Sequence, residues 1–262
     1  MKYDFITSDK IRPLLKTDYF GKKVFAFWRL QSTNEFAYNL AHNGEPEGTM
    51  VIAEEQLKGR GRQKRKWHST FGKGLWFSII LRPAAEVSKP GIFPFLAGVS
   101  VAQAVENLYG LKPQFKWPND LFLDQKKFCG ILSEVEFQNN HVSFIVLGIG
   151  INANHSPDDF THDIQDIATS LRMHSLIKID RIGLLVEILR LLEQHYLFAT
   201  EYAFDFVKDN WKKRCPRIGQ KIEIMQDNIH YTGIFEDLDQ DGGLLLRRRD
   251  GHLTKIVAGD FM

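Results

Sequence analysis

The sequence predicts an α/β (α+β) domain built on a mixed, largely antiparallel sheet, followed by a small SH3-like β-barrel. Two observations lead to this fold class. Between residues 1 and 213, apolar runs with strand character alternate with segments whose apolar residues recur at helical spacing. From 214 to 262, short strand-like runs are separated by turns rich in Asp, Asn and Gly, and Pro216 with Gly219 breaks the chain just before the first run. We therefore expect two domains, 1–213 and 214–262.

The first elements can be placed in chain order. A strand is predicted at 23–30, and Ser32 with Glu35 three residues later is the capping-box pattern of a helix N-terminus. Two further strands are predicted at 49–55 and 75–82, because both runs are rich in β-branched and aromatic residues. A basic loop therefore connects two neighbouring strands.

The remaining elements complete the two domains. Residues 92–109 have the apolar spacing of a helix that packs on a sheet. Residues 130–150 predict a β-hairpin, with a turn at 138–141 that is longer than two residues. Residues 182–211 are predicted to be helical over most of their length. The second domain contains four strand-like runs, at 221–225, 231–238, 243–249 and 253–258.

Composition is that of a soluble, folded protein. Of 262 residues, 44% are apolar and 25% are charged, and the formal net charge of +2 argues against a chain devoted to nucleic acid or to an anionic membrane. Cys129 and Cys215 form no C-x-x-C pair, so neither a zinc site nor a disulfide framework is indicated. The start has no signal-peptide pattern, and charges interrupt the apolar stretch 182–192. We expect a cytoplasmic protein with no membrane span.

The basic loop concentrates positive charge between glycines. Its cations and glycines are Lys58, Gly59, Arg60, Gly61, Arg62, Lys64, Arg65 and Lys66. Glycine lets the backbone approach a ligand, and guanidinium groups form bidentate, charge-assisted bonds with phosphate or carboxylate oxygens. A mobile basic surface loop or a nucleic-acid patch would have the same composition. Composition alone does not choose between these interpretations.

Two more polar stretches are candidates for a site. In Lys116-Trp117-Pro118-Asn119-Asp120, the carboxylate of Asp120 is suited to bind Mg²⁺ or to accept a hydrogen bond from an amine, and Lys127 is suited to neutralise an oxyanion or a phosphate. The simpler interpretation of the first stretch is an ordinary Pro-Asn-Asp turn. In Gly148-Ile149-Gly150-Ile151-Asn152, small residues can admit a ligand ring or a phosphate, but no βαβ unit frames them as in a dinucleotide-binding fingerprint.

Together, these stretches resemble biotin protein ligases. Five motifs occur in the family's order: Ser32-Thr33-Asn34, then Gln56 with Gly59-Arg60-Gly61-Arg62 and Arg65-Lys66-Trp67, then Lys116-Trp117-Pro118-Asn119-Asp120, then Lys127 with Gly130-Ile131-Leu132 and Glu134, and then Gly148-Ile149-Gly150-Ile151-Asn152. The small C-terminal β domain is also similar, so the resemblance covers nearly the whole chain. It implies a class II synthetase-like catalytic domain of the biotin–lipoate ligase type.

The resemblance implies roles for the matched residues. Hydroxyl and amide groups suit the biotin ureido ring, and apolar walls suit its thiophane ring. The expected biotin-binding residues are Ser32, Thr33, Asn34, Gln56, Gly59, Arg60, Arg62, Lys127, Gly130 and Gly148. The expected ATP- and adenylate-binding residues are Arg60, Arg62, Arg65, Trp67, Asn119, Asp120, Lys127 and Asn152. The expected catalytic residues are Lys127, Arg62 and Asp120, with Asp120 also the candidate Mg²⁺ ligand.

The implied reaction has two steps. ATP converts the biotin carboxylate to biotinyl-5′-AMP with release of pyrophosphate, and a lysine amine from the biotin carboxyl carrier domain of a carboxylase then displaces AMP. The loop cations and Mg²⁺ offset the charge of the anions that meet in the first step. Because a mixed anhydride hydrolyses in water, the loop must close between the steps. We therefore expect residues 58–66 to be disordered in the free enzyme.

Two features limit what the resemblance carries over. Lys64 stands where family members often have glycine, which would stiffen the loop and add charge. Only about thirty residues precede Ser32, too few for the N-terminal helix-turn-helix of some members, so we expect neither DNA binding nor repressor function. The resemblance allows a homodimer formed through the central sheet.

Two other functions stay open on sequence alone. A lipoate protein ligase shares the reaction type and a related fold, and adenylation of lipoate but not biotin would favour it. A non-enzymatic nucleic-acid-binding protein would use the basic loop, Arg247-Arg248-Arg249 and the small barrel, although the balanced net charge argues against it.

Overall fold

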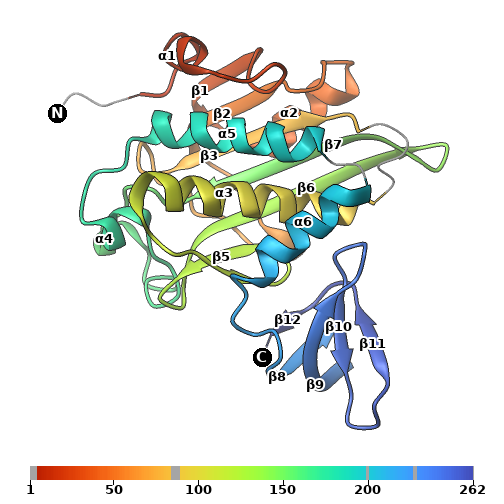
Figure 1. Ribbon diagram of the computed structural model, residues 1–262. Helices are drawn as coiled ribbons and strands as arrows, with labels where there is room; N and C mark the ends of the chain where they lie inside the picture. Colours follow the sequence, from red (N-terminus) through yellow and green to blue (C-terminus); the bar gives the residue numbers. More distant parts are fainter. Residues whose placement is uncertain (1–4, 84–88, 199–200, 227–228, 262) are drawn as a thin grey trace.

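A seven-stranded mixed sheet organises the large domain in the computed structural model, which describes residues 5–83, 89–198, 201–226 and 229–261 (Figure 1). The strand order is β1-β2-β3-β7-β6-β5-β4. Neighbouring strands β1 and β2 are parallel, and the other neighbours in this sheet are antiparallel. The predicted mixed, largely antiparallel sheet is confirmed. Its strands are β1 (Val24–Leu30), β2 (Met50–Gln56), β3 (Leu75–Leu81), β4 (Gln114–Lys116), β5 (Asp120–Leu123), β6 (Lys126–Gln138) and β7 (His141–Ile151).

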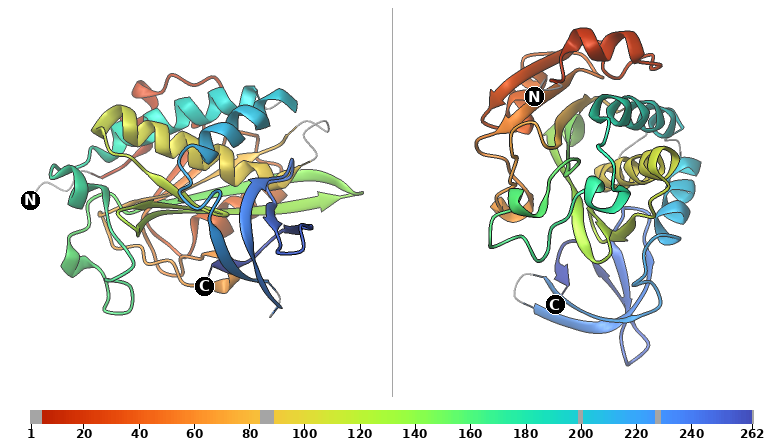
Figure 2. Two further views of the ribbon diagram at one scale, coloured as in Figure 1. Left: turned by 60° about the horizontal axis from the view of Figure 1, so that its bottom comes forward. Right: turned by 90° about the vertical axis from the view of Figure 1, so that its left-hand side faces the viewer.

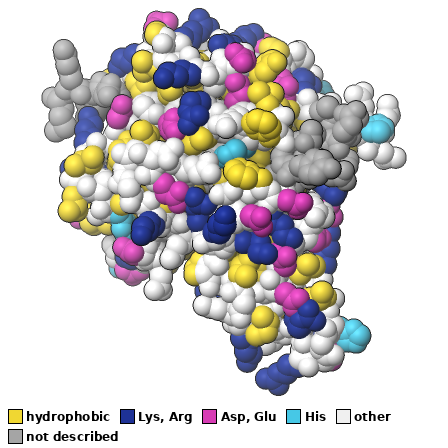
Figure 3. All heavy atoms as spheres, viewed as in Figure 1, with side chains coloured by type: hydrophobic (Ala, Val, Ile, Leu, Met, Phe, Trp, Pro, Cys, Tyr) yellow, Lys and Arg dark blue, Asp and Glu magenta, His cyan; other side chains and the backbone are white. Residues whose placement is uncertain are grey.

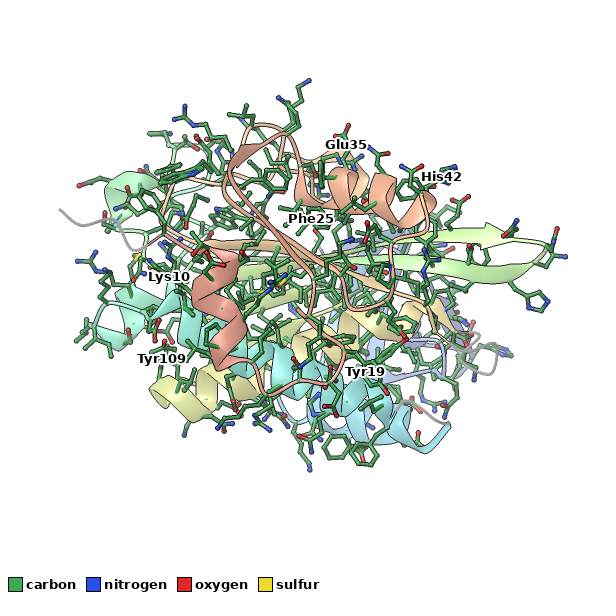
Figure 4. All side chains as sticks on the ribbon, turned by 90° about the horizontal axis from the view of Figure 1, so that it is seen from above. Lys10, Tyr19, Phe25, Glu35, His42 and Tyr109 are labelled. Atoms are coloured by element: carbon green, nitrogen blue, oxygen red, sulfur yellow. The ribbon has the colours of Figure 1, made fainter. Side chains whose placement is uncertain are left out.

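Alternation along the strands supplies each face of the sheet with its own core. Met50 and Ile52 of β2 belong to the main apolar cluster, whereas Val51 between them belongs to a second cluster on the other face. Helices α3 (Phe93–Tyr109), α5 (Arg181–Leu197) and α6 (Glu201–Lys212) lie together on the first face (Figure 2). Helix α2 (Thr33–His42) covers the second, with Glu35 and His42 near its two ends (Figure 4).

Short helical turns connect these elements. They are α1 (Ser8–Ile11), η1 (Arg12–Leu14), η2 (Arg62–Lys64), η3 (Pro90–Ile92), η4 (Pro157–Asp159) and α4 (Leu171–Ser175). Together η3 and α3 form the one helical stretch of the described chain, Pro90–Tyr109, that is long and apolar enough to cross a membrane. Most of this stretch is buried inside the protein, as in the core helix of a folded domain.

The hairpin between β6 and β7 differs from the prediction. Its turn contains only Asn139 and Asn140, whose φ angles are 50° and 64°, and Gln138 pairs directly with His141. The expectation of a loop longer than two residues was therefore wrong. The paired strands therefore continue to Gln138 and His141. A two-residue turn is possible because asparagine tolerates the left-handed conformation that a tight hairpin requires.

The small domain is a five-stranded antiparallel sheet in the order β11-β10-β9-β8-β12. Its strands are β8 (Lys221–Gln226), β9 (Ile229–Leu238), β10 (Leu244–Arg247), β11 (Leu253–Ile256) and β12 (Asp260–Phe261). The predicted SH3-like β fold is confirmed, although sequence reasoning missed the short strand β12. The domain extends below the large one (Figure 1). The predicted boundary at 213/214 falls in the turn between α6 and β8.

Buried contacts join the two domains. Trp211 of α6 stacks on Phe115 of β4, with ring centroids 5.5 Å apart, and lies 6.3 Å from Phe235 of β9. The indole N–H of Trp117 donates to the carbonyl of Gly242 at 2.9 Å. On the face with helices α3 and α5, basic and acidic side chains are interspersed (Figure 3).

Candidate active site

The floor of a cavity of about 490 Å³ is a row of residues in register across four strands. Lys116 of β4 pairs with Asp120 of β5, Asp120 with Gly130 of β6, and Gly130 with Gly150 of β7. Residues that pair across strands point to the same face of a sheet. The two glycines remove side chains from the middle of the row, and the Trp67 ring occupies the space. A Cβ atom would come within 2.9 Å of that ring at Gly130 and 2.8 Å at Gly150.

Helix α2 begins at one end of this cavity. Ser32 is its N-cap, and its hydroxyl accepts from the backbone N–H of Glu35 at 3.4 Å, as the capping pattern predicted. The cap places Thr33 and Asn34 in the first turn, where both are buried. A helix N-terminus thus presents neutral hydroxyl and amide groups to the cavity.

These groups form one network with Gln56 at the end of β2 and Ser78 in the middle of β3. Gln56 Oε1 accepts from the backbone N–H of Thr33 at 2.8 Å and from its hydroxyl at 3.0 Å, and Gln56 Nε2 donates to Ser69 at 3.1 Å. Ser78 Oγ lies 2.8 Å from Thr33 Oγ1 and 2.6 Å from Asn34 Oδ1. Sequence reasoning missed Ser78 because it lies inside an apolar strand run. The network fixes the direction of each donor and acceptor at this end of the cavity.

Gly148 lets α2 sit on the sheet. It pairs with Ser78 and Leu132, and a Cβ atom at this position would lie 1.9 Å from Asn34 Oδ1. Asn34 Nδ2 donates to Glu134 Oε2 at 2.9 Å and to the carbonyl of Leu132 at 3.3 Å. The glycine is therefore required by the neighbouring asparagine.

Cationic side chains surround the middle of the cavity. Lys127 Nζ lies 2.6 Å from Asp120 Oδ1 and 5.2 Å from the centre of the Trp67 ring. Arg62 Nη1 donates to Asn119 Oδ1 at 3.2 Å. Arg60 Nη2 lies 3.4 Å from a carboxylate oxygen of Glu134, in a partly exposed pair. Arg65 Nη2 donates to Gln63 at 2.9 Å. The loop and the 116–127 stretch thus bring their cations together.

The basic loop folds as a tight turn over the cavity. The N–H of Gly61 donates to the Arg65 carbonyl at 2.7 Å, and that of Trp67 to the Gly59 carbonyl at 2.9 Å. Gln63 takes the left-handed conformation, with φ of 52°. Disorder of this loop in the free enzyme stays a prediction.

The opposite wall is apolar and was not predicted. Phe160, Ile164 and Ala168 line it, in a segment for which the sequence analysis predicted no element. The N–H of Lys127 donates to the Ile167 carbonyl at 2.8 Å, which ties this segment to β6. Asn152 Nδ2 donates to the Thr169 carbonyl at 3.0 Å, so one function of Asn152 is to hold this wall. The sequence signal that could have indicated this wall is the spacing of its apolar residues, at positions 160, 164, 167 and 168.

His155 lies beside Phe160 in the lining of the cavity. It is only 1% exposed, and its ring stacks on that of Phe160 with centroids 5.0 Å apart. Burial lowers the pKa of His155 to about 4, so the imidazole is neutral near pH 7. Within the described part of the chain, no three His, Cys, Asp or Glu side chains form a metal-binding group.

The cavity unites the residues that the motifs singled out. Those lining it are Ser32, Thr33, Asn34, Gln56, Arg60, Arg62, Arg65, Trp67, Asn119, Asp120, Lys127, Gly130, Gly148 and Asn152. Gly59 is the exception, because it lies outside the lining and shapes the loop instead: a Cβ atom there would come within 2.5 Å of the Trp67 carbonyl. Further lining residues that were not assigned include His68, Lys116, Phe122, Gln125 and Ile167.

Comparison with known proteins agrees with this geometry. Residues 26–152 match the biotin/lipoate A/B protein ligase family, and residues 218–262 match the biotin protein ligase C-terminal domain. A bifunctional ligase/repressor BirA of Bacillus subtilis (strain 168) is 38% identical, over 97% of this chain and 78% of that protein. The chain belongs to the biotin protein ligase family.

Other members of the biotin protein ligase family are similar across both domains. A biotin–[acetyl-CoA-carboxylase] ligase of Mycobacterium tuberculosis is 30% identical over 87% of this chain and 84% of its own. The structure of a biotin protein ligase from Aquifex aeolicus in complex with biotin and ATP has a TM-score of 0.79 and 29% identity, covering 92% of this chain and 98% of the other. The class II synthetase-like fold expected from the resemblance is thereby confirmed.

Proposed function

We propose that this biotin protein ligase converts biotin and ATP to biotinyl-5′-AMP in the cavity and then transfers biotin to a lysine of a carrier domain. One observation carries the proposal. The floor of the cavity contains glycines, and the cavity joins two groups of side chains. At one end is the network of neutral donors and acceptors around Thr33 and Gln56, and in the middle is the cluster of cations. An acid with an uncharged polar ring at one end and a carboxylate at the other would meet the neutral network with its ring and the cations with its carboxylate.

Biotin is assigned to the slot by the polarity of its ends. The ureido ring would meet Thr33 and Gln56, whose hydrogen-bonding groups are already oriented by one another. The carboxylate would then point toward Lys127 and Arg62. These are the residues that offset charge when the carboxylate approaches the α-phosphate. The adenine of ATP is assigned to the apolar wall at Phe160 and to the ring of Trp67.

Mg²⁺ is proposed to enter with ATP. Asp120 is one carboxylate, and it is paired with Lys127, so most ligands of such an ion would be phosphate oxygens and water, as is usual for Mg²⁺ bound with nucleotides. The ion would neutralise phosphate charge. In the transfer step, the Asp120 carboxylate is placed to accept a hydrogen bond from the incoming amine, while Lys127 remains to stabilise the departing AMP.

The proposal also includes the acceptor protein, the cellular compartment, the oligomeric state and the absence of DNA binding. Two free, buried cysteines suit a cytoplasmic protein, and the acceptor would be the biotin carboxyl carrier domain of a carboxylase. Strand β1 stands at one end of the strand order, and a homodimer through the central sheet would form along this edge. Absence of DNA binding is supported by the near-zero net charge and can be checked by a gel-shift assay.

The acid specificity of adenylation tests this proposal. We would measure exchange of labelled pyrophosphate into ATP with Mg²⁺ and biotin, lipoate or octanoate, in the natural chain and in Arg62→Ala. Exchange with biotin alone, reduced at least about 100-fold in the variant, is expected because the guanidinium meets developing charge. Exchange with lipoate alone would assign the chain to lipoate ligation instead. No exchange with any acid would remove the ligase function.

A further inference from the structure

Lys116 is the outermost residue of the row that forms the floor of the cavity, and the function proposed above gives it no role. Its ammonium lies 5.5 Å from the centre of the Phe122 ring and 5.9 Å from that of Phe261, and the residue lines the cavity. Phe122 belongs to the neighbouring strand β5, whereas Phe261 belongs to β12 of the small domain. One cation of the cavity is therefore held between aromatic rings from both domains.

The ring of Phe261 is itself held in place. Phe261 pairs with Ile224 of β8, and the Arg217 guanidinium lies 4.9 Å from the ring centre. Trp117, the residue after Lys116, meets Phe261 edge-on with centroids 6.5 Å apart and donates its indole N–H to Gly242. The stretch that carries Lys116 and the last strand of the small domain are thus fastened together.

The position of Lys116 suits one part of ATP. Biotin is assigned to the end at Thr33 and adenine to the wall at Phe160. Lys116 lines the same cavity and pairs with Asp120, the proposed Mg²⁺ ligand. We propose that Lys116 binds the β- and γ-phosphates of ATP, and that Phe261 is a positioning residue that sets the ammonium for this contact. This inference rests on the proposed function and extends it to the small domain.

The chemistry of the two steps makes the inference specific. In adenylation, a biotin carboxylate oxygen bonds to the α-phosphorus, the bond from that phosphorus to its bridging oxygen breaks, and pyrophosphate leaves with the electron pair. A cation on the leaving side stabilises the negative charge that develops there. In transfer, the lysine amine attacks the acyl carbon and AMP leaves, so no triphosphate is present. Lys116 should therefore matter in the first step alone.

We would test this by measuring the two half-reactions separately in Lys116→Met, Lys116→Arg and the natural chain. Adenylation is followed as pyrophosphate exchange with ATP and pyrophosphate varied, and transfer as biotinylation of a carrier domain from synthetic biotinyl-5′-AMP. Lys221→Met, an exposed lysine on β8, is the matched control. Retained transfer also shows that each variant is folded.

We expect Lys116→Met to lower kcat/KM for ATP in exchange on the order of 10- to 100-fold, the usual effect of losing a charged hydrogen bond. The KM for pyrophosphate should rise in parallel, and Lys116→Arg should recover part of the loss. The rate of transfer should change by less than about 2-fold, because no β- or γ-phosphate is present in that step for the Lys116 charge to stabilise. An equal loss in both half-reactions, or none in exchange, would overturn the assignment. If the natural chain shows no biotin-dependent exchange, the proposed function fails first.

A second set of variants tests Phe261. Phe261→Leu should reduce adenylation on the order of 3- to 10-fold while Phe261→Tyr retains it, because the tyrosine keeps the ring face that attracts the ammonium. In a Lys116→Met background, Phe261→Leu should have no additional effect on adenylation, since the partner cation is gone. Additive losses would show that Phe261 acts through general stability of the small domain and would refute its positioning role.

Discussion

At the scale of single residues, Gly148 shows how one missing side chain arranges the polar end of the cavity. In Gly148→Ala, the new Cβ would collide with Asn34 Oδ1, so the first turn of α2 must shift. We expect destabilisation of about 1–3 kcal/mol and weaker biotin binding, measured by chemical denaturation and calorimetry.

A double variant isolates the cause. Adding Asn34→Ala to Gly148→Ala removes the atom that the Cβ meets, so the stability losses of the two changes should be less than additive. Full additivity would show that the glycine acts independently of Asn34.

His195 makes stability depend on pH. It lies on α5 and is 6% exposed, with Nδ1 2.9 Å from Ser100 Oγ of α3. Burial, followed by the charge of Arg190, lowers the pKa of His195 to about 4. The unfolded chain takes up a proton near pH 6.5, which the folded chain resists until about pH 4. The stability contribution of the neutral ring is therefore complete above pH 6.5 and declines as the pH falls toward 4.

The measurement is the free energy of unfolding between pH 4 and 7 for the natural chain and His195→Leu. We expect the natural chain to lose up to about 2–3 kcal/mol more than the variant over this range. Ser100 keeps its bond to the Leu96 carbonyl in the variant. Identical pH profiles would contradict the assignment, although His155 contributes a slope of the same sign to both proteins.

At the scale of elements, the basic loop is expected to respond to ligand. Several backbone hydrogen bonds hold it, and most of its side chains are exposed, so little apolar burial stabilises it without substrate. We expect trypsin to cut residues 58–66 readily in the free chain and at least about 10-fold more slowly with biotin and ATP, because cleavage follows the open population. Sites at Arg248 and Arg249 are the internal control. Equal cleavage with and without ligands would contradict loop closure.

A buried ion pair fixes α5 to the sheet. Arg181, the first residue of α5, lies 2.7 Å from Glu54 of β2 and also donates to the Gly74 carbonyl at 3.0 Å. Arg181→Met leaves the Glu54 carboxylate buried, with the N–H of Ile6 still donating to it at 2.7 Å. We expect a loss of about 3–5 kcal/mol in unfolding free energy.

The matched double variant adds Glu54→Gln, which keeps an acceptor for Ile6 and removes the uncompensated charge. We expect this change to restore at least half of the loss, because the penalty comes from the unpaired charge. The measurement is the free energy of unfolding, from urea titrations of the natural chain, Arg181→Met and the double variant. A double variant less stable than Arg181→Met would refute this explanation.

Sequence reasoning succeeded with elements where pattern and packing agree. The positions of β1, β2, β3 and α3 followed from apolar patterns, and the Ser32 cap followed from a local pattern. The short strands β4 and β5 were not predicted. It failed where tertiary contacts decide, as in the two-residue turn at Asn139 and the apolar wall at Phe160, which depends on Asn152 and Lys127 to hold it.

At the scale of the whole molecule, the sequence could name most of the residues that line the cavity but not their arrangement. The register that aligns Lys116 and Asp120 with Gly130 and Gly150 depends on strand pairing, which no single motif contains. The proposed role of Phe261 was likewise hidden, because the contact of its ring with Lys116 forms only where the small domain packs on the large one.

The most direct test of the central claim is the identity of the compound that the protein makes. Incubation with biotin, ATP and Mg²⁺, followed by mass spectrometry of the protein-bound fraction, should reveal biotinyl-5′-AMP. Subsequent addition of a carrier domain should convert it to AMP and a biotinylated lysine. Recovery of unchanged biotin and ATP from a folded protein, with no adenylate and no modified lysine, would contradict the function derived from the cavity.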